Sequence, residues 1–172
     1  DQLVNMTTAQ VSNLSSAAVK ALTTAQLSKL SAEQVTALSS TQVKALSSDQ
    51  VNALTIDQLQ AIDKADVAAM TTAQISSIST TQIANLSGDQ VKALSSAQVR
   101  ALTTGQIAKL TAEQFSAIDA ADVAALTTTQ VEKLGNEQLA SMTTAQVNNL
   151  STAADNALTT AQLSKLSAEQ VT

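Results

Sequence analysis

Residues 22–36 read LTTAQLSKLSAEQVT, which holds two successive copies of one eight-residue pattern, L-[ST]-x-x-Q-[VIL]-x-x. The pattern recurs in register from Met6 to Leu166, and the first position of every copy is Leu, Ile or Met. The sixth position is apolar in every copy except one, where Asp155 stands. A repeat this strict sets the architecture before any single residue does, so the sequence predicts a stack of nearly equivalent octads.

Each octad carries the residues that start an α-helix. Position 2 is Ser or Thr in most octads, and Gln follows three residues later at position 5, as in Thr23 and Gln26. A Ser or Thr at the N-cap accepts a hydrogen bond from the amide of the third helical residue. A Gln at that third residue accepts one from the N-cap amide in return, which completes a capping box. Positions 1 and 6 flank the box as a hydrophobic staple. We therefore expect a very short capped helix in each octad.

The charged residues support the same helix starts. Of the 14 acidic residues, eight lie at position 4, in the expected first turn. Of the nine basic residues, eight lie at position 7 or 8, next to the expected helix end. The helix dipole favours this separation by about 0.3–1 kcal/mol per exposed charge. The alternative, that charges fill whichever positions face water, does not explain why the two signs are separated.

A single continuous helix does not fit an eight-residue period. Each residue of an α-helix turns by about 100°, so the Leu stripe would drift by about 80° in each octad. In a strand, positions 1 and 6 would point to opposite faces, and a two-sided β-solenoid is the alternative that remains open. The chain has three Gly, no Pro and many Ala, Gln, Leu and Lys residues, which favour helices over tight turns. The sequence therefore predicts an all-α fold.

One octad cannot fold alone. Burying its Leu and Val gives about 3–6 kcal/mol, whereas ordering eight backbone residues costs roughly 8–16 kcal/mol. The octads must therefore stack and cover each other's apolar faces, which is the arrangement of a solenoid. We expect Leu and Val to line its axis, while the pattern leaves open how many octads complete one coil.

Longer repeats are superimposed on the octads. Residues 1–36 match residues 137–172 at 29 of 36 positions, which is an offset of 136 residues or 17 octads. Residues 63–69 are echoed at 119–125, an offset of seven octads. Because 7 and 17 are primes, duplication has not respected one whole number of octads per coil, and a non-integer number is indicated. Residues 1–172 form a single uninterrupted array that starts and stops within an octad, and we expect it to be a fragment of a longer array.

Composition restricts the possible partners. The net charge of −5 and a pI near 4.5 argue against binding of nucleic acid or anionic membranes. Phe115 is the only aromatic residue, so bases and sugars have no stacking platform. No apolar run approaches the length of a membrane span, so we expect no membrane insertion. The chain has no His and no Cys, which excludes zinc sites and catalysis based on these residues. We expect no cofactor and no enzymatic activity.

Five acidic residues stand out as candidate sites. Asp63 with Asp66, and Asp119 with Asp122, are weak candidates for Ca²⁺, because hard cations bind carboxylates. The competing interpretation is that Asp simply replaces Ser at the N-cap and Gln at the third helical residue. Asp155 stands at an apolar position, where an unpaired carboxylate is costly to bury. We interpret it as a local defect, a partner contact or a carboxyl of raised pKa.

Octads of the forms LTTAQVxxL and LSSxQVxAL, such as Leu38–Leu46 (LSSTQVKAL), carry a resemblance to known proteins. The array resembles the long repeat tracts of very large bacterial surface or secreted proteins, which are grouped with haemagglutinin-like or adhesin-like sequences. The resemblance covers the whole chain. It implies an extended structural role outside the cell or on its surface.

Two functions are compatible with these observations. The first is an extracellular structural protein that forms a rod, stalk or filament, with self-association head-to-tail or laterally into a fibre. The second is an adhesin-type binding module, or a spacer that presents a distal head, with a surface glycan or a host or cell component as its partner. An exposed row of one residue type at position 3, 7 or 8 would favour binding, and those positions vary here.

Overall fold

The computed structural model describes residues 3–170, which fall into two compact units that divide at Leu86. All regular elements in these described residues are helices, and none is a strand. The predicted all-α solenoid of tandem octads is confirmed, and the β-solenoid alternative is excluded for this part of the chain. Each octad from Met6 to Leu158 contributes one α-helix of four to six residues.

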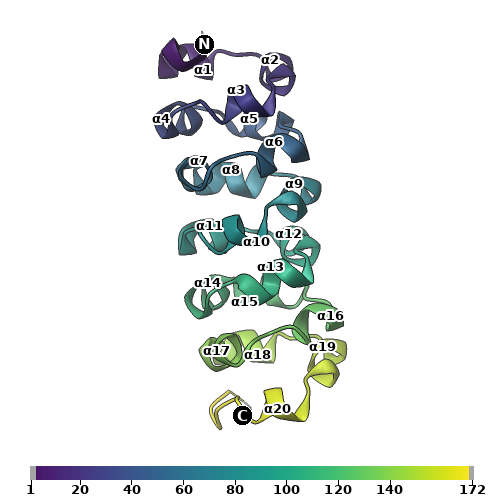
Figure 1. The fold of residues 1–172 in the computed structure, drawn as a ribbon. Coiled ribbons are helices and arrows are strands. Elements are labelled where there is room, and N and C mark those ends of the chain that lie inside the picture. Colours follow the sequence, from purple (N-terminus) through teal and green to yellow (C-terminus); the bar gives the residue numbers. More distant parts are fainter. Residues whose placement is uncertain (1–2, 171–172) are drawn as a thin grey trace. The chain divides into compact units, whose positions relative to one another are not determined.

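The first unit winds its helices into successive coils, as Figure 1 shows from the purple N-terminal end onward. It begins with one short 3-10 helix, which is followed by ten α-helices within its described residues. Their bounds are η1 (Leu3–Asn5), α1 (Thr8–Ser12), α2 (Ser16–Ala21), α3 (Thr24–Leu27), α4 (Ala32–Thr36), α5 (Ser40–Ala45), α6 (Ser48–Asn52), α7 (Ile56–Ala61), α8 (Lys64–Ala69), α9 (Thr72–Ser77) and α10 (Thr80–Ile83).

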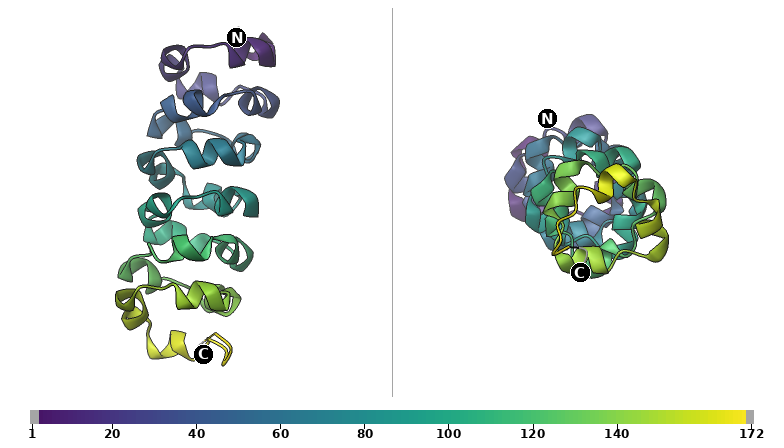
Figure 2. Two further views of the ribbon diagram at one scale, coloured as in Figure 1. Left: turned by 180° about the vertical axis from the view of Figure 1, so that it is seen from behind. Right: turned by 90° about the horizontal axis from the view of Figure 1, so that it is seen from below.

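The second unit repeats this construction, and Figure 2 shows its coils from behind. The same short helix and extended link alternate along its described residues. Their bounds are α11 (Gly88–Lys92), α12 (Ser96–Ala101), α13 (Thr104–Lys109), α14 (Ala112–Ala117), α15 (Ala120–Val123), α16 (Thr128–Val131), α17 (Asn136–Ser141), α18 (Thr144–Asn148), α19 (Thr152–Ala157) and α20 (Thr160–Leu163).

The predicted capping boxes form wherever an octad has both Ser or Thr at position 2 and Gln at position 5. In α3, the Gln26 amide donates to Thr23 Oγ1 at 3.2 Å, and the Thr23 amide donates to Gln26 Oε1 at 2.9 Å. The N-cap residue has extended backbone, with φ −71° and ψ 156°, so it breaks the preceding turn. A new helix therefore starts at each position 2, which keeps every helix short.

The exceptions follow the sequence. In α2 and α19, the hydroxyls of Ser15 and Ser151 accept a hydrogen bond from the amide of the third helical residue. That residue is alanine, which cannot accept a bond in return, so only one of the two hydrogen bonds of the capping box forms. Gly135 has no side chain, and its amide alone donates to Gln138 Oε1, at 2.7 Å. These helices still form, which shows that packing compensates for an incomplete cap.

The core consists of the side chains at positions 1 and 6, as predicted. From Val11 to Leu139 every position-6 side chain is at most 1% exposed. From Leu30 to Met142 the position-1 side chains are at most 5% exposed. Burial of one such side chain stabilises the fold by about 1.5–3 kcal/mol. The interior of each unit is therefore a continuous apolar column supplied by two residues of each octad.

Helices that lie three apart in sequence pack against each other. In the first unit α2 packs against α5 and α5 against α8, and in the second unit α11 packs against α14 and α14 against α17. Side-chain hydrogen bonds reach one helix further, since Gln42 in α5 donates to the Val11 carbonyl in α1. The number that the sequence left open thus lies between three and four octads per coil.

We expect Leu139→Ala to lower the free energy of unfolding by about 2–5 kcal/mol, because it leaves a cavity in the apolar column. Leu139 in α17 is fully buried at position 6. Urea denaturation followed by circular dichroism measures the change. The matched control is Asn148→Ala, at an exposed position of α18, for which we expect a change within about 0.5 kcal/mol. Equal effects of the two substitutions would contradict the assignment of the core.

Candidate functional site

The position-5 glutamines join neighbouring coils. Gln146 is 1% exposed, and its Oε1 accepts the Thr143 amide hydrogen bond at 2.8 Å within its own capping box. Its Nε2 donates to the carbonyl oxygens of Phe115 at 3.1 Å, Ser116 at 3.2 Å and Ile118 at 2.7 Å. These carbonyls lie at the end of α14, in the preceding coil. One carboxamide therefore caps the start of one helix and the end of another.

The same pair of hydrogen-bonding roles, Oε1 as acceptor and Nε2 as donor, is repeated by glutamines in both units. We call each such glutamine a rung. In every rung Nε2 donates to the carbonyl oxygen 28 residues earlier, at 2.6–3.1 Å. Most rungs add a bond to the carbonyl 31 residues earlier, as in Gln74 to Val43 at 2.8 Å. The rungs include Gln34, Gln42, Gln50, Gln58, Gln74 and Gln82 in the first unit, and Gln130, Gln138, Gln146, Gln162 and Gln170 in the second.

The rungs solve a problem that very short helices create. An α-helix leaves its first four amides and last four carbonyls without partners inside the helix, so a helix of four to six residues is almost entirely made of ends. Buried carbonyls without a donor would each cost about 1–3 kcal/mol. The rungs supply donors to these carbonyls in the interior, where water does not reach.

Sequence reasoning placed Gln in the capping box and missed its second bond. A signal was present, because a capping box accepts either Glu or Gln at its third helical residue. Position 5 is Gln in 17 of 21 octads and never Glu. Glutamate offers only acceptors, whereas the carboxamide also carries two donor hydrogens. The absence of Glu indicated that these donors are used.

Two octads replace the rung by a different bond between coils. Asp66 is 8% exposed, and its Oδ1 accepts a hydrogen bond from the Ser40 hydroxyl at 2.5 Å. In the second unit, Asp122 accepts from the Ser96 hydroxyl in the same way. Both pairs span 26 residues. A carboxylate has no hydrogen to donate to a carbonyl, so Asp66 and Asp122 instead accept a hydrogen bond from the hydroxyl of Ser40 or Ser96.

Three of the four calcium candidates, Asp63, Asp66 and Asp122, accept hydrogen bonds within the chain. Asp63 Oδ1 accepts the Ala65 amide at 2.9 Å as the N-cap of α8, whereas Asp119 makes no side-chain cap bond to α15. Within residues 3–170 no group of three or more His, Cys, Asp or Glu side chains is arranged to hold a metal ion. Calcium binding at Asp63, Asp66, Asp119 and Asp122 stays an untested prediction.

Asp155 lies exposed in α19, beside a hollow of about 380 Å³. The walls of this hollow include Val147, Leu158, Leu163 and Leu166. These apolar neighbours partly withdraw the carboxylate from water, and this desolvation raises the pKa of Asp155 above its ordinary value of 3.8. The structure therefore supports the interpretation of a carboxyl of raised pKa.

The ALTTAQ repeat family model matches the chain five times in succession, at residues 1–32, 32–63, 59–96, 91–118 and 115–152. The letters ALTTAQ themselves stand at residues 21–26 and 157–162. The matched stretches are 28 to 38 residues long, so each is at least as long as the 28-residue span of a rung. No curated protein matches the chain.

We expect Gln146→Glu to lower the free energy of unfolding at pH 7 by roughly 3–5 kcal/mol, the range for an uncompensated buried charge. The glutamate keeps the capping-box acceptor but turns the three donor contacts into contacts between oxygens. Gln10→Glu is the matched control, because Gln10 accepts the Thr7 amide at 2.8 Å yet is exposed. Chemical denaturation at pH 7 compares them, and similar losses in both variants would contradict the rung.

We expect Asp155→Asn to stabilise the chain increasingly as pH rises. A raised pKa means that the folded state binds more protons than the unfolded state above pH 3.8, so the wild type loses stability as pH rises through the folded pKa. Below 3.8 both states are protonated at Asp155, and the two proteins should differ little. Urea denaturation at intervals from about pH 3.5 to about 7 measures the gap. A gap that stays constant or shrinks with rising pH would contradict the effect.

Proposed function

The chain belongs to the ALTTAQ repeat family, and from this membership and the rung geometry we propose that it is the structural part of an extracellular or cell-surface rod, stalk or filament. The tandem family matches and the α-solenoid of each unit indicate a repetitive structural protein. The proposal concerns the place where this solenoid acts and the assembly that it forms.

The observation that carries the proposal is that rungs end on backbone carbonyls. Gln42 and Gln138 both donate to the carbonyls 28 and 31 residues earlier, although the residues that supply those carbonyls differ. Any octad can thus accept a rung from a later octad, whatever its side chains. Such a solenoid can be lengthened by adding octads, because the new contacts between coils need no specific side chain as acceptor. This property suits a protein that has to span a long distance.

The same contacts explain how such a structure would bear load. To pull one coil from the next, all rungs between them must break together while the apolar column is exposed to water. Each hydrogen bond contributes about 0.5–1.5 kcal/mol net, and each uncovered Leu or Val adds about 1.5–3 kcal/mol. Because successive coils within each unit repeat these contacts, resistance within a unit is spread over many hydrogen bonds and apolar contacts.

Self-association into a fibre is part of the proposal. A rung binds the neighbouring coil through a glutamine carboxamide and backbone carbonyl oxygens, and successive coils within each unit carry these groups. A head-to-tail contact between copies could use the same groups, and repeated heterologous contacts generate filaments. Lateral association of coils is the other route to a fibre.

A location outside the cell is supported by the resemblance to surface repeat tracts. Within residues 3–170, no helix has both the length and the apolar character needed to cross a membrane. The acidic net charge of −5 keeps a repetitive protein soluble at high local concentration. The second candidate, a binding module or spacer, is favoured by one observation, the lysine-lined hollow described in the next subsection.

Electron tomography of the source cells, labelled with gold-conjugated antibodies against the octads, tests the proposal. We expect labelled uniform fibres or stalks on intact cells. Label that appears only after lysis would overturn the extracellular location. Labelled stalks that end in a distinct globular head would favour the spacer, and compact labelled particles without extension would overturn the structural role.

A further inference from the structure

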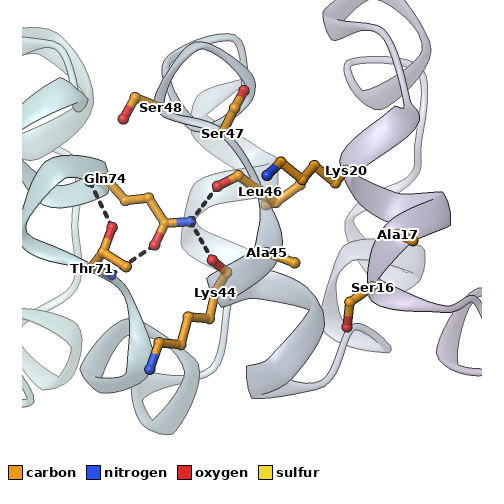
Figure 3. Close-up of a pocket in the computed structure, with 10 residues that line it drawn as sticks. All are labelled: Ser16, Ala17, Lys20, Lys44, Ala45, Leu46, Ser47, Ser48, Thr71 and Gln74. Atoms are coloured by element: carbon orange, nitrogen blue, oxygen red, sulfur yellow. Dashed lines mark hydrogen bonds between the residues drawn. The ribbon is translucent and has the colours of Figure 1, made fainter.

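A hollow of about 450 Å³ opens across three successive coils of the first unit. Figure 3 shows its wall, with Ser16 and Lys20 on α2, Lys44 at the end of α5, and Ser48 at the start of α6. Gln74, a rung of the following coil, closes one side through its bonds to the Lys44 and Leu46 carbonyls at 3.5 and 2.8 Å. The rung therefore gives the hollow a fixed backbone wall.

The hollow is positively charged in an acidic chain. Its lining includes Lys20 and Lys44 and no acidic residue, although the chain has a net charge of −5. Both lysines are exposed, and neither forms an ion pair with any residue of the described chain. In Figure 3 the Lys20 side chain extends from α2 towards Leu46, and the Lys44 side chain runs from the end of α5 in the direction away from Lys20. Two unpaired ammonium groups thus flank one depression.

Serine side chains also line this hollow. Ser16 and Ser48 are half-buried in the wall, and within residues 3–170 their hydroxyls make no hydrogen bond. Ser47, which is also in the lining, accepts the Gln50 amide at 3.1 Å as an N-cap. Serine hydroxyls both donate and accept, so the wall offers small polar contacts around an apolar floor that contains Ala45.

A second hollow provides an internal comparison. In the second unit, a hollow of about 430 Å³ is lined by Ala108, Leu110, Thr111, Gly135 and Gln138, each 64 residues after its counterpart in the first. Ala108 stands where the first hollow has Lys44, and Glu137 adds a negative charge to this lining. The same backbone corner is therefore positively charged in one unit and negatively charged in the other, as its side chains dictate.

We propose that the hollow between Lys20 and Lys44 binds a short segment of an acidic polysaccharide, with anionic groups on successive sugars meeting the two ammonium groups. Two lysines from different coils in one lining match a ligand that carries more than one anionic group. The free serine hydroxyls match the hydroxyls of a sugar. This site goes beyond the structural role, and it would remain if the chain formed no fibre.

The lining distinguishes this ligand from other polymers. Binding of single-stranded nucleic acid relies on aromatic side chains that stack on bases, and Phe115, the only aromatic residue, is fully buried. A neutral polysaccharide would also lack a stacking surface and would gain nothing from the lysines. An acidic oligosaccharide draws its binding energy from charge-assisted hydrogen bonds, which are about twice as strong as neutral ones.

The test titrates the 172-residue chain, labelled with ¹⁵N, with a tetramer of galacturonic acid and, separately, with its methyl ester. We expect the acid to shift the amide signals of residues 16–20 and 44–48 and not those of 108–112 and 135–138. The methyl ester should leave all of them unchanged. In Lys20→Ala/Lys44→Ala the dissociation constant should rise by about tenfold or more, since two charge-assisted bonds are lost.

The matched control is Lys109→Ala/Lys133→Ala, which removes two exposed lysines that are likewise 24 residues apart and lie outside the hollow. Its affinity should stay within about twofold of the wild type, as for charges distant from the ligand. Equal weakening in both variants, binding of the methyl ester, or absence of shifts with the acid would overturn the site. Equally tight, lysine-dependent binding of an oligonucleotide of the same charge would overturn the assignment to a polysaccharide.

Discussion

The structure depends on the side-chain carboxamide of the position-5 glutamines, which accepts one hydrogen bond through Oε1 and donates others through Nε2. Helices of four to six residues consist almost entirely of unpaired ends, and such helices are unstable in isolation. A position-5 glutamine satisfies the start of its own helix through Oε1 and the end of a helix in the preceding coil through Nε2. Where a rung forms, one side chain thereby serves both the local cap and the contact between coils. The apolar column supplies most of the stabilisation, and the rungs set the register in which it packs.

Local features could be predicted from the sequence because they involve residues within one octad. Thr23 and Gln26 predict their capping box, and the apolar positions 1 and 6 predict the core, because both signals recur within eight residues. The rung could not be predicted in the same way. It joins Gln146 to backbone carbonyls 28–31 residues earlier, and a backbone acceptor leaves no side-chain pattern to read. The coil number was hidden for the same reason.

The less regular octads show how far this construction tolerates change. Asp66 and Asp122 exchange the rung for a bond to a serine of the preceding coil, and Asp155 places an exposed carboxylate of raised pKa at position 6. The sequence marked all three as unusual, but their partners depend on which residues adjacent coils bring together. The hollow of Lys20 and Lys44 was likewise out of reach, because its lining comes from three coils that are separated along the chain.

A coil that holds between three and four octads separates two kinds of information in this chain. The caps and the core depend only on the eight-residue period. The outer surface depends on the longer period of one coil, which determines which residues lie above one another. Inserting or deleting one octad preserves the eight-residue period but changes the position of every later octad around the coil. Each later side chain therefore points to a different side of the solenoid. Such a chain can rewrite its surface by gaining or losing whole octads while its interior remains unchanged.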